Sequence, residues 1–234
     1  MIELQSVRVE VAVPRAGAPA ATRTLLDGID LVLAERRIGV IGANGSGKST
    51  LLRLLNGLVL PSAGRVLVDG LDTRQDGRKV RQRVGFVFTD PLAQLVMATP
   101  ADDLELSLRR TIPDRAARRA RAQDLLVARG LGDLADQSVY DLSGGERQLV
   151  ALTSILATEP ATIVADEPTT LLDLRNRELV RQALVSLDQQ LVLATHDLEM
   201  AATMDRVIVI DDGRVVADGP AEASIASYVG MMAR

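Results

Sequence analysis

A nine-residue stretch, GANGSGKST from Gly42 to Thr50, constrains the fold of this 234-residue chain more than any other feature. It fits the pattern G-x-x-x-x-G-K-[ST] and lies between a strand-like apolar segment, RIGVIG, and a leucine-rich helical segment, STLLRLLNGL. Glycines let such a loop point its N–H groups at phosphate oxygens, and the helix N-terminus adds partial positive charge. The stretch predicts a strand, a phosphate loop and a helix. The residues expected around the phosphates are Gly42, Ala43, Asn44, Gly45, Ser46, Gly47, Lys48, Ser49 and Thr50.

Lysine usage singles out one residue of this loop. Among 27 cationic side chains only Lys48 and Lys79 are lysines. A lysine ammonium is a compact point charge suited to the β- and γ-phosphates, whereas the fork of an arginine is not equivalent. We therefore expect Lys48 to bind phosphate and Ser49 to bind Mg²⁺, against the alternative of a plain glycine-rich turn before a helix.

Strand and helix patterns alternate along most of the chain, which predicts an α/β fold with a parallel sheet covered on both faces. The N-terminal IELQSVRVEVAV alternates with period two, as expected of a strand, and GIDLVLA is a second strand candidate. Helix signals dominate from about Pro91 to Leu142, and the strand–helix alternation resumes from Ser143. We expect an α/β core interrupted by a helical insertion.

Two carboxylates end an apolar strand candidate, ATIVADEP. Asp166 and Glu167 would lie at the carboxyl edge of the sheet, where ligands of α/β proteins bind. There Asp166 is placed to hold the Mg²⁺ shell, and Glu167 to position or deprotonate an attacking water. A pair of acidic residues capping a turn before Pro168 is the simpler alternative.

The segment DLSGGERQ predicts a second helix start. Ser143 is a good N-cap, and Glu146 three residues later completes a capping box. Gly144 and Gly145 leave N–H groups accessible, so this end could hold a phosphate. The residues alone do not decide between that site and a merely well-capped helix.

Composition limits the classes of partner. The net charge of −4 argues against nucleic-acid binding, and a chain without cysteine has neither disulfides nor a thiolate zinc site, which is compatible with a reducing compartment. No signal peptide and no apolar run of about 20 residues is found, so a soluble chain that can dock on a membrane protein is expected.

The order of GANGSGKST, LSGGERQ, IVADEP, TLLD and ATHD resembles the nucleotide-binding subunits of ATP-binding cassette (ABC) transporters over essentially the whole chain. The resemblance implies a P-loop NTPase with a RecA-like core, an antiparallel β subdomain and an α-helical subdomain. It implies a single ABC ATPase domain over residues 1–234, with the helical signature subdomain inserted at residues 91–157 and ATP and Mg²⁺ as cofactors.

The resemblance also assigns residues across a dimer. Each ATP would lie between the phosphate loop of one chain and the signature residues of the second, namely Leu142, Ser143, Gly144, Gly145 and Glu146. It implies that Asp173 is the D-loop aspartate and that His196, the only histidine, contacts the γ-phosphate and the water held by Glu167. A carboxylate is ionised at neutral pH without tuning, so Glu167 is the better base.

Two departures from the family pattern stand out. Where the family has a glutamine after the strand VGFVF, this chain has Thr89, and Gln94 lies five residues later. Both are candidates for the Q-loop role, Thr89 as a metal contact and Gln94 as a residue docking on a membrane partner. The family also stacks adenine on an N-terminal aromatic, but the matching place near Val11 has none, so adenine is expected to rest on aliphatic side chains with modest base selectivity.

The segments PTTLLDLRN and FTDPLAQLVM are similar to ATPases of energy-coupling-factor (ECF) modules for biotin. The similarity implies a subunit on the cytoplasmic face of the membrane that hydrolyses ATP. It would power import of a vitamin such as biotin, or of a transition metal, and the second ATPase chain would form a homodimer with it. A transmembrane coupling protein and a substrate-binding membrane protein are the implied partners. A soluble ABC ATPase such as an iron–sulfur assembly ATPase, and more weakly an exporter half, are the alternatives.

Arginines cluster in the helical region. They are Arg109, Arg110, Arg115, Arg118, Arg119 and Arg121. A solvated helix face is the default expectation for such a run. Contact with anionic lipid head groups or with an acidic surface of a membrane partner is the alternative.

Overall fold

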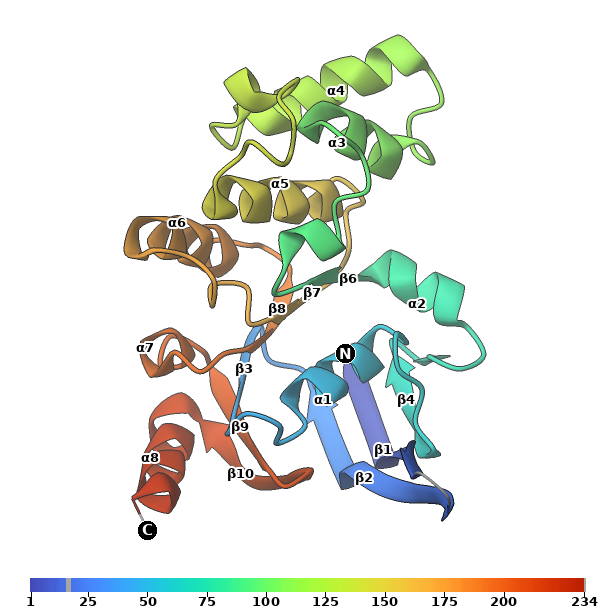
Figure 1. Cartoon of the computed structure of the whole chain (residues 1–234), viewed down its shortest axis with the longest axis vertical. Coiled ribbons are helices and arrows are strands. Elements are labelled where there is room, and N and C mark those ends of the chain that lie inside the picture. The colour runs from blue at the N-terminus through green and yellow to red at the C-terminus, as the bar shows by residue number, and fades with distance from the viewer. Residues whose placement is uncertain (16–17, 234) are drawn as a thin grey trace. The chain divides into compact units, whose positions relative to one another are not determined.

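The computed structural model describes residues 1–15 and 18–233 (Figure 1). The chain forms two compact units. The first comprises Met1–Val84 and Gln190–Arg234, and the second is the intervening Gly85–Gln189. The elements of the first unit are β1 (Ile2–Arg15), β2 (Ala18–Leu33), β3 (Arg37–Ile41), α1 (Lys48–Leu55), β4 (Ala63–Val68), β5 (Leu71–Asp72), α2 (Gly77–Arg83), β8 (Gln190–Ala194), α7 (Leu198–Ala201), β9 (Arg206–Asp211), β10 (Arg214–Pro220) and α8 (Ala221–Met232).

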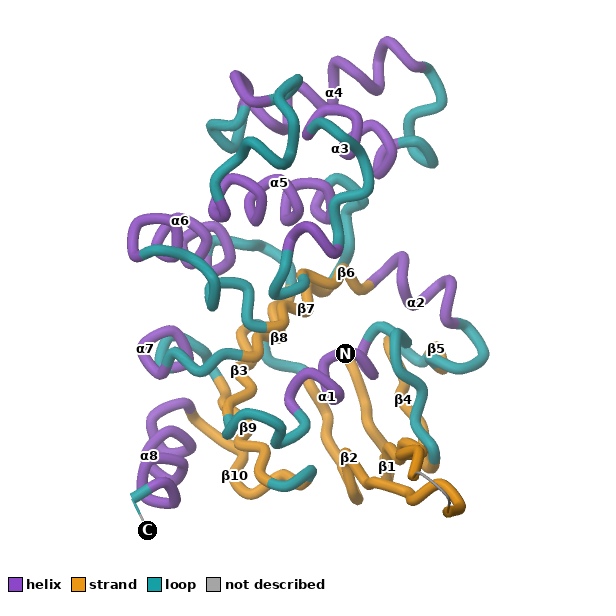
Figure 2. The backbone as a smooth tube through the Cα atoms, viewed as in Figure 1, coloured by secondary structure: helices purple, strands orange, loops and turns teal. Residues whose placement is uncertain are grey.

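An antiparallel sheet in the order β2-β1-β4-β5 forms one part of the first unit (Figure 2). Ile2 and Leu4, and after them Val7 and Val9, are buried in β1 at period-two spacing, and this spacing shifts by one residue between Leu4 and Val7, where the register with β2 also shifts. Strand β2 is longer than the expected strand at Gly28, because pairing with β1 extends it back to Ala18. The structure therefore contains the antiparallel β subdomain that was expected.

The other strands of the first unit lie in the order β10-β9-β3-β8. Strand β3 is parallel to β8 and β9, and β9 and β10 form an antiparallel hairpin. All five residues of β3 are buried, so its carboxyl end is a fixed starting point for the loop that follows. The short strand β5 and helix α2 were not expected from the sequence.

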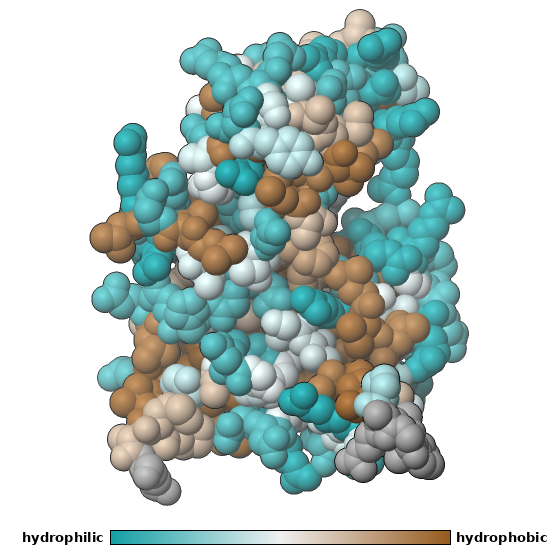
Figure 3. All heavy atoms as spheres, viewed as in Figure 1, coloured by the Kyte–Doolittle hydropathy of each residue, from teal (hydrophilic) through white to brown (hydrophobic). Residues whose placement is uncertain are grey.

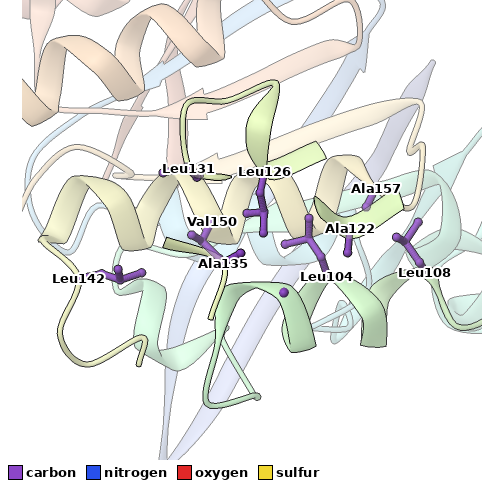
Figure 4. Packing of buried hydrophobic residues seen from close by; sticks show 10 residues of the cluster. Leu104, Leu108, Ala122, Leu126, Leu131, Ala135, Leu142, Val150 and Ala157 are labelled. Carbon is purple, nitrogen blue, oxygen red and sulfur yellow. The ribbon is translucent and has the colours of Figure 1, made fainter. Parts of the chain in front are cut away.

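The second unit is mainly helical. Its elements are β6, which begins at the boundary (Val84–Val87), the 3-10 helices Pro91–Ala93 and Gly132–Leu134, α3 (Pro100–Leu108), α4 (Arg115–Val127), α5 (Gly144–Leu156), β7 (Thr162–Asp166) and α6 (Leu174–Val185). Leucine and alanine side chains of α3, α4 and α5 form one buried cluster, with Leu104, Ala122, Leu126 and Val150 at its centre (Figure 4). This core lies within the 91–157 segment. The bounds of that subdomain, like the single domain over 1–234, stay predictions.

Two of the clustered arginines, Arg118 and Arg119, form ion pairs within the second unit. Arg119 binds Asp102 and Glu105 on α3, at 3.1 and 2.9 Å, and also Asp136, while Arg118 lies 3.8 Å from Glu105. These bonds hold α4 against α3. The other four, Arg109, Arg110, Arg115 and Arg121, are exposed. The face visible in Figure 3 is largely hydrophilic around α4, which agrees with the solvated-face expectation for those four.

Candidate functional site

The phosphate loop connects the buried strand β3 to helix α1. The ammonium of Lys48, only 6% exposed, donates hydrogen bonds to the carbonyl oxygens of Gly42 and Ala43, at 2.8 and 3.0 Å. These bonds fold the lysine side chain back over the loop. The ammonium of Lys48 therefore lies within the loop, where the N-terminus of helix α1 adds partial positive charge.

The loop is held from two sides. A Cβ on Gly47, which has a φ of 114°, would lie 2.8 Å from Leu26 Cδ2 and 3.0 Å from the carbonyl oxygen of Leu25, so β2 approaches too closely for a side chain. On the other side, the backbone N–H of Gly213, in the β9–β10 turn, donates to the carbonyl oxygen of Ser46 at 2.9 Å. The buried Ser46 hydroxyl has no partner among the described residues, which leaves a polar atom in the loop for a ligand.

His196 lies at the same sheet edge as this loop. Strands β8 and β3 are parallel neighbours, with Ala194 paired to Val40, and both end at the edge where the phosphate loop starts. Thr195, which is buried, donates its N–H to the carbonyl oxygen of Val40 at 3.2 Å. The next residue, His196, is exposed. The first unit thus brings the predicted switch histidine and the phosphate loop to one edge of a sheet.

The acidic pair ends strand β7 in the second unit. Asp166 is buried, and Glu167 has a φ of 50°, in the left-handed region that non-glycine residues rarely adopt. The Glu167 carboxylate accepts a 2.7 Å hydrogen bond from the Thr170 hydroxyl. Such strained backbone often marks a site where a side chain must point in one direction.

Thr89, one of the two Q-loop candidates, lies beside this pair. Its hydroxyl donates to the backbone carbonyl of Asp166 at 2.7 Å. A hydroxyl that donates its proton still offers oxygen lone pairs, so Thr89 keeps the chemistry required of a metal contact.

Gln94, the other candidate, is bound within its own unit. Its amide oxygen accepts from the N–H of Phe88 at 3.3 Å, and its amide nitrogen donates to the carbonyl oxygen of Ala151 at 2.9 Å. Docking of Gln94 on a membrane partner would break these two bonds.

One stripe of α5, three residues apart at each step, holds the segment around Thr89. Gln148 donates to the carbonyl oxygen of Phe88 at 3.0 Å, Ala151 accepts from Gln94, and Ser154 donates to the buried carboxylate of Asp103 at 2.8 Å. Residues at this spacing share a helix face. The helix that starts at Ser143 is thus attached to the segment leading to Thr89.

The capping box predicted for LSGGERQ is present. The Ser143 hydroxyl accepts from the Glu146 N–H at 3.2 Å, and the Glu146 carboxylate accepts from the Ser143 N–H at 2.7 Å. Ser143 is exposed, while Gly144 is half-buried and Gly145 is buried. The N-terminus of α5 therefore remains open at Ser143.

Gly145 lies against the first turn of α6. A Cβ at Gly145 would be 2.4 Å from Asn176 Oδ1, so only glycine fits beneath that side chain. Asn176 is in turn held by Asp173, whose carboxylate accepts from the Asn176 N–H at 2.8 Å and from its amide nitrogen at 2.9 Å. The predicted signature residue Gly145 and the predicted D-loop residue Asp173 are in contact through Asn176.

The sequence did not single out Asn176, Gln148 or Asp103. Each acts through a partner distant in sequence, so no local motif marks it. The only available signals were a polar residue at a core position of a helix, for Gln148 and Asp103, and an asparagine in the first turn after an N-cap aspartate.

A strand, a phosphate loop with a buried lysine and a following helix define a P-loop nucleotide-binding protein. The family model described as "ABC transporter" matches residues 26–170, and the chain belongs to this family. The family and the P-loop fold expected from the five ordered motifs are thereby confirmed.

Named relatives and a solved structure agree with this. The chain is 44% identical over 213 residues to the biotin transport ATP-binding protein BioM of Rhizobium etli, covering 91% of this chain and 95% of that protein. It is 42% identical to the energy-coupling factor transporter ATP-binding protein EcfA1 of Symbiobacterium thermophilum, over 86% of this chain and 72% of that protein. A dimeric post-hydrolysis structure of the ATP-binding cassette MJ0796 with ADP and Pi has a TM-score of 0.82 at 29% identity, covering 94% and 99% of the two chains.

Proposed function

We propose that this chain is the ATP-hydrolysing subunit of an energy-coupling-factor importer. The observation that carries the proposal is the phosphate loop, in which Lys48 folds over the Gly42 and Ala43 carbonyls next to the strand that leads to His196. The similarity to BioM and EcfA1 supports the importer class. Both are named as transport ATP-binding proteins, which favours this function over a soluble iron–sulfur assembly ATPase.

The chain would act as a homodimer with two composite sites. ATP bound at the phosphate loop of one copy would contact Ser143, Gly144 and Gly145 of the second copy. The open N-terminus of α5 suits a phosphate, since its first N–H groups and the helix dipole both favour negative charge. The dimeric MJ0796 structure supports the homodimer. ATP binding would favour the closed dimer, and loss of phosphate the open one.

Hydrolysis would proceed by attack of water on the γ-phosphorus, with ADP as the leaving group. Glu167 would accept the proton of that water, and its orientation is fixed by the Thr170 hydroxyl. Lys48 would offset the charge that develops on the phosphate oxygens. His196 would contact the γ-phosphate, and Asp173 would report its loss to the dimer interface.

The donor set suits Mg²⁺, which prefers oxygen ligands and keeps several waters. Ser49, Asp166 and Thr89 offer two hydroxyls and one carboxylate, and these residues would hold the ion. Bound there, Mg²⁺ would offset the negative charge of the phosphates. In the described part of the chain no group of three or more histidine, aspartate or glutamate side chains is gathered as a metal cluster.

Transport requires membrane partners. Among the described residues, no helix has the length and apolar character needed to cross a bilayer. The chain would dock on the cytoplasmic face of the membrane, through the segment from Thr89 to Asp103, against a transmembrane coupling protein. A substrate-binding membrane protein would supply specificity for a vitamin or a transition metal, and biotin is the first substrate to test.

Purification in detergent and reconstitution test the proposal. We expect the chain to co-purify with a coupling protein and a small multi-span protein. In proteoliposomes whose lumen holds both the ATPase subunit and ATP, the complex should accumulate labelled biotin. The same complex with Glu167→Gln should not transport. Recovery of soluble partners alone would overturn the importer function and favour the assembly ATPase.

A further inference from the structure

The hairpin of β1 and β2 lies directly beside the phosphate loop. Gly47 approaches Leu26 Cδ2 and the Leu25 carbonyl so closely that a Cβ would lie within 3.0 Å of each. A nucleotide held by its phosphates must extend its ribose and base past one flank of the loop. The hairpin flank continues beyond Leu25 as two paired strands, so it offers a surface for the base.

Strand pairing identifies the residues of that surface. Val9 pairs with Leu26 and faces the core, and Val11, two residues on, points to the same side of β1. Val11 pairs with Arg23, and the register shift between the Val9–Leu26 and Glu10–Thr24 pairs places both side chains on the side of Leu26. Leu25 lies at this shift and pairs with no residue of β1, and Arg23 is two residues from it. Val11 and Arg23 are both exposed. They are therefore the first exposed pair beyond the buried residues Val9 and Leu26 on the face of the hairpin that contacts Gly47.

Arg23 is distinguished from the other arginines on this flank. Asp27, whose N–H bonds the Gly213 carbonyl, binds Arg8 and Arg214 at 2.6 Å each. The hydrogen bond from Arg8, with the charges of both arginines, keeps the pKa of Asp27 below its ordinary value. Both guanidinium groups are therefore occupied. The Arg23 side chain makes no hydrogen bond or ion pair with any of the described residues.

The chemistry of this pair suits a purine. A guanidinium is planar and weakly hydrated, and it stacks on aromatic faces. The aliphatic side chain of Val11 adds apolar contact. No phenylalanine, tyrosine or tryptophan precedes Phe86, so no aromatic ring of this segment competes for the role.

We propose that Arg23, beside Val11, is the platform on which the purine base of the bound nucleotide stacks. This inference rests on nucleotide binding at the phosphate loop. It places base recognition on β2 and replaces the expectation that adenine rests on aliphatic side chains alone. Stacking on a guanidinium plane does not distinguish adenine from guanine, so it retains the expectation of modest base selectivity.

Calorimetric titration of the full-length chain tests the proposal with two ligands, ATP and inorganic tripolyphosphate, which has no base. The measured quantity is the ratio of the tripolyphosphate Kd to the ATP Kd. Arg23→Ala should lower this ratio by about tenfold. Arg23→Lys should lower it similarly, because an ammonium keeps the charge without the plane. Arg23→Tyr should retain most of it, since a phenol ring stacks without charge.

Arg65→Ala is the matched control. Arg65 is an exposed arginine of β4 in the same sheet, and it lies opposite Gln5 rather than beside Val11. It should leave the ratio unchanged while removing the same charge.

A ratio unaltered in Arg23→Ala, or fully retained in Arg23→Lys, overturns the inference. Wild-type chain that binds ATP but never hydrolyses it would overturn the proposed function instead, because the binding ratio does not depend on turnover.

Discussion

The hydroxyl of Thr89 and the backbone carbonyl of Asp166 are joined by a 2.7 Å hydrogen bond. The bond fixes the second residue after β6 to the last residue of β7, where the predicted catalytic carboxylates begin. Both residues belong to one compact unit, so their relation does not depend on the other unit. This contact gives Thr89 a structural reason to matter for hydrolysis that Gln94 does not share.

Thr89→Ala should therefore reduce ATPase activity more than Gln94→Ala. The first removes the hydroxyl beside Asp166, while the second removes two hydrogen bonds, each worth about 1 kcal/mol of folding stability. Steady-state ATPase assays and thermal melts on both variants separate the effects, and Thr89→Ser should keep most activity. The opposite activity ranking would show that Gln94 has the Q-loop role.

Glu167→Gln should trap ATP in a closed dimer. The amide keeps the size of the side chain but cannot accept a proton, so hydrolysis should fall by roughly 10²- to 10⁴-fold. Gel filtration with ATP should show a dimer that disappears when ADP replaces ATP. Hydrolysis at the wild-type rate would mean that another group is the base.

His196→Ala should reduce hydrolysis by roughly 10²-fold, the scale of losing one transition-state contact, while the ATP Kd changes little. The residue is exposed and follows β8, so its removal should leave the thermal midpoint near that of the wild type. Single-turnover hydrolysis and equilibrium binding on the same preparation check this. Normal turnover would make the lone histidine an ordinary surface residue.

Gly145→Ala should destabilise the chain by about 1–3 kcal/mol, because its Cβ would overlap Asn176. Gly144→Ala is the comparison for stability, since its Cβ would meet only the flexible end of Leu172, at 3.1 Å. Denaturant unfolding measures both. Adding Asn176→Gly to Gly145→Ala should recover part of the loss, because it removes all three Asn176 atoms within 2.6 Å of the added Cβ, and a double variant no more stable than Asn176→Gly and Gly145→Ala combined would place the strain elsewhere.

Local patterns were the predictable part of this fold. The Ser143 capping box lies within four residues, and β3, the loop and α1 follow one another directly, so sequence alone located them. The length of β2 depends on its pairing with β1, and no alternation in the sequence marks residues before Gly28. The segment HDLEMAATM predicts a helix through Met204, but helix α7 ends at Ala201.

The site was predictable where residues sit in motifs and not where they meet across the fold. Lys48 begins a helix, and Asp166, Glu167 and His196 lie at the end of a strand or within two residues of it, so their neighbourhood follows from topology. The contact of Asn176 with Gly145, and the pairing of Arg23 with Val11, arise from tertiary packing and strand register. The sequence around Asn176 or Arg23 does not indicate these partners.

The scarcity of lysine has a practical consequence for experiments on this chain. Lys48 is almost fully enclosed and its ammonium is bonded to two carbonyls, whereas the Lys79 side chain on α2 is 67% exposed. An amine-reactive fluorophore will acylate Lys79 and the N-terminus and leave the loop lysine unmodified. The chain thus supplies its own labelling positions on the first unit, and fluorescence studies need no cysteine introduced into a protein that has none.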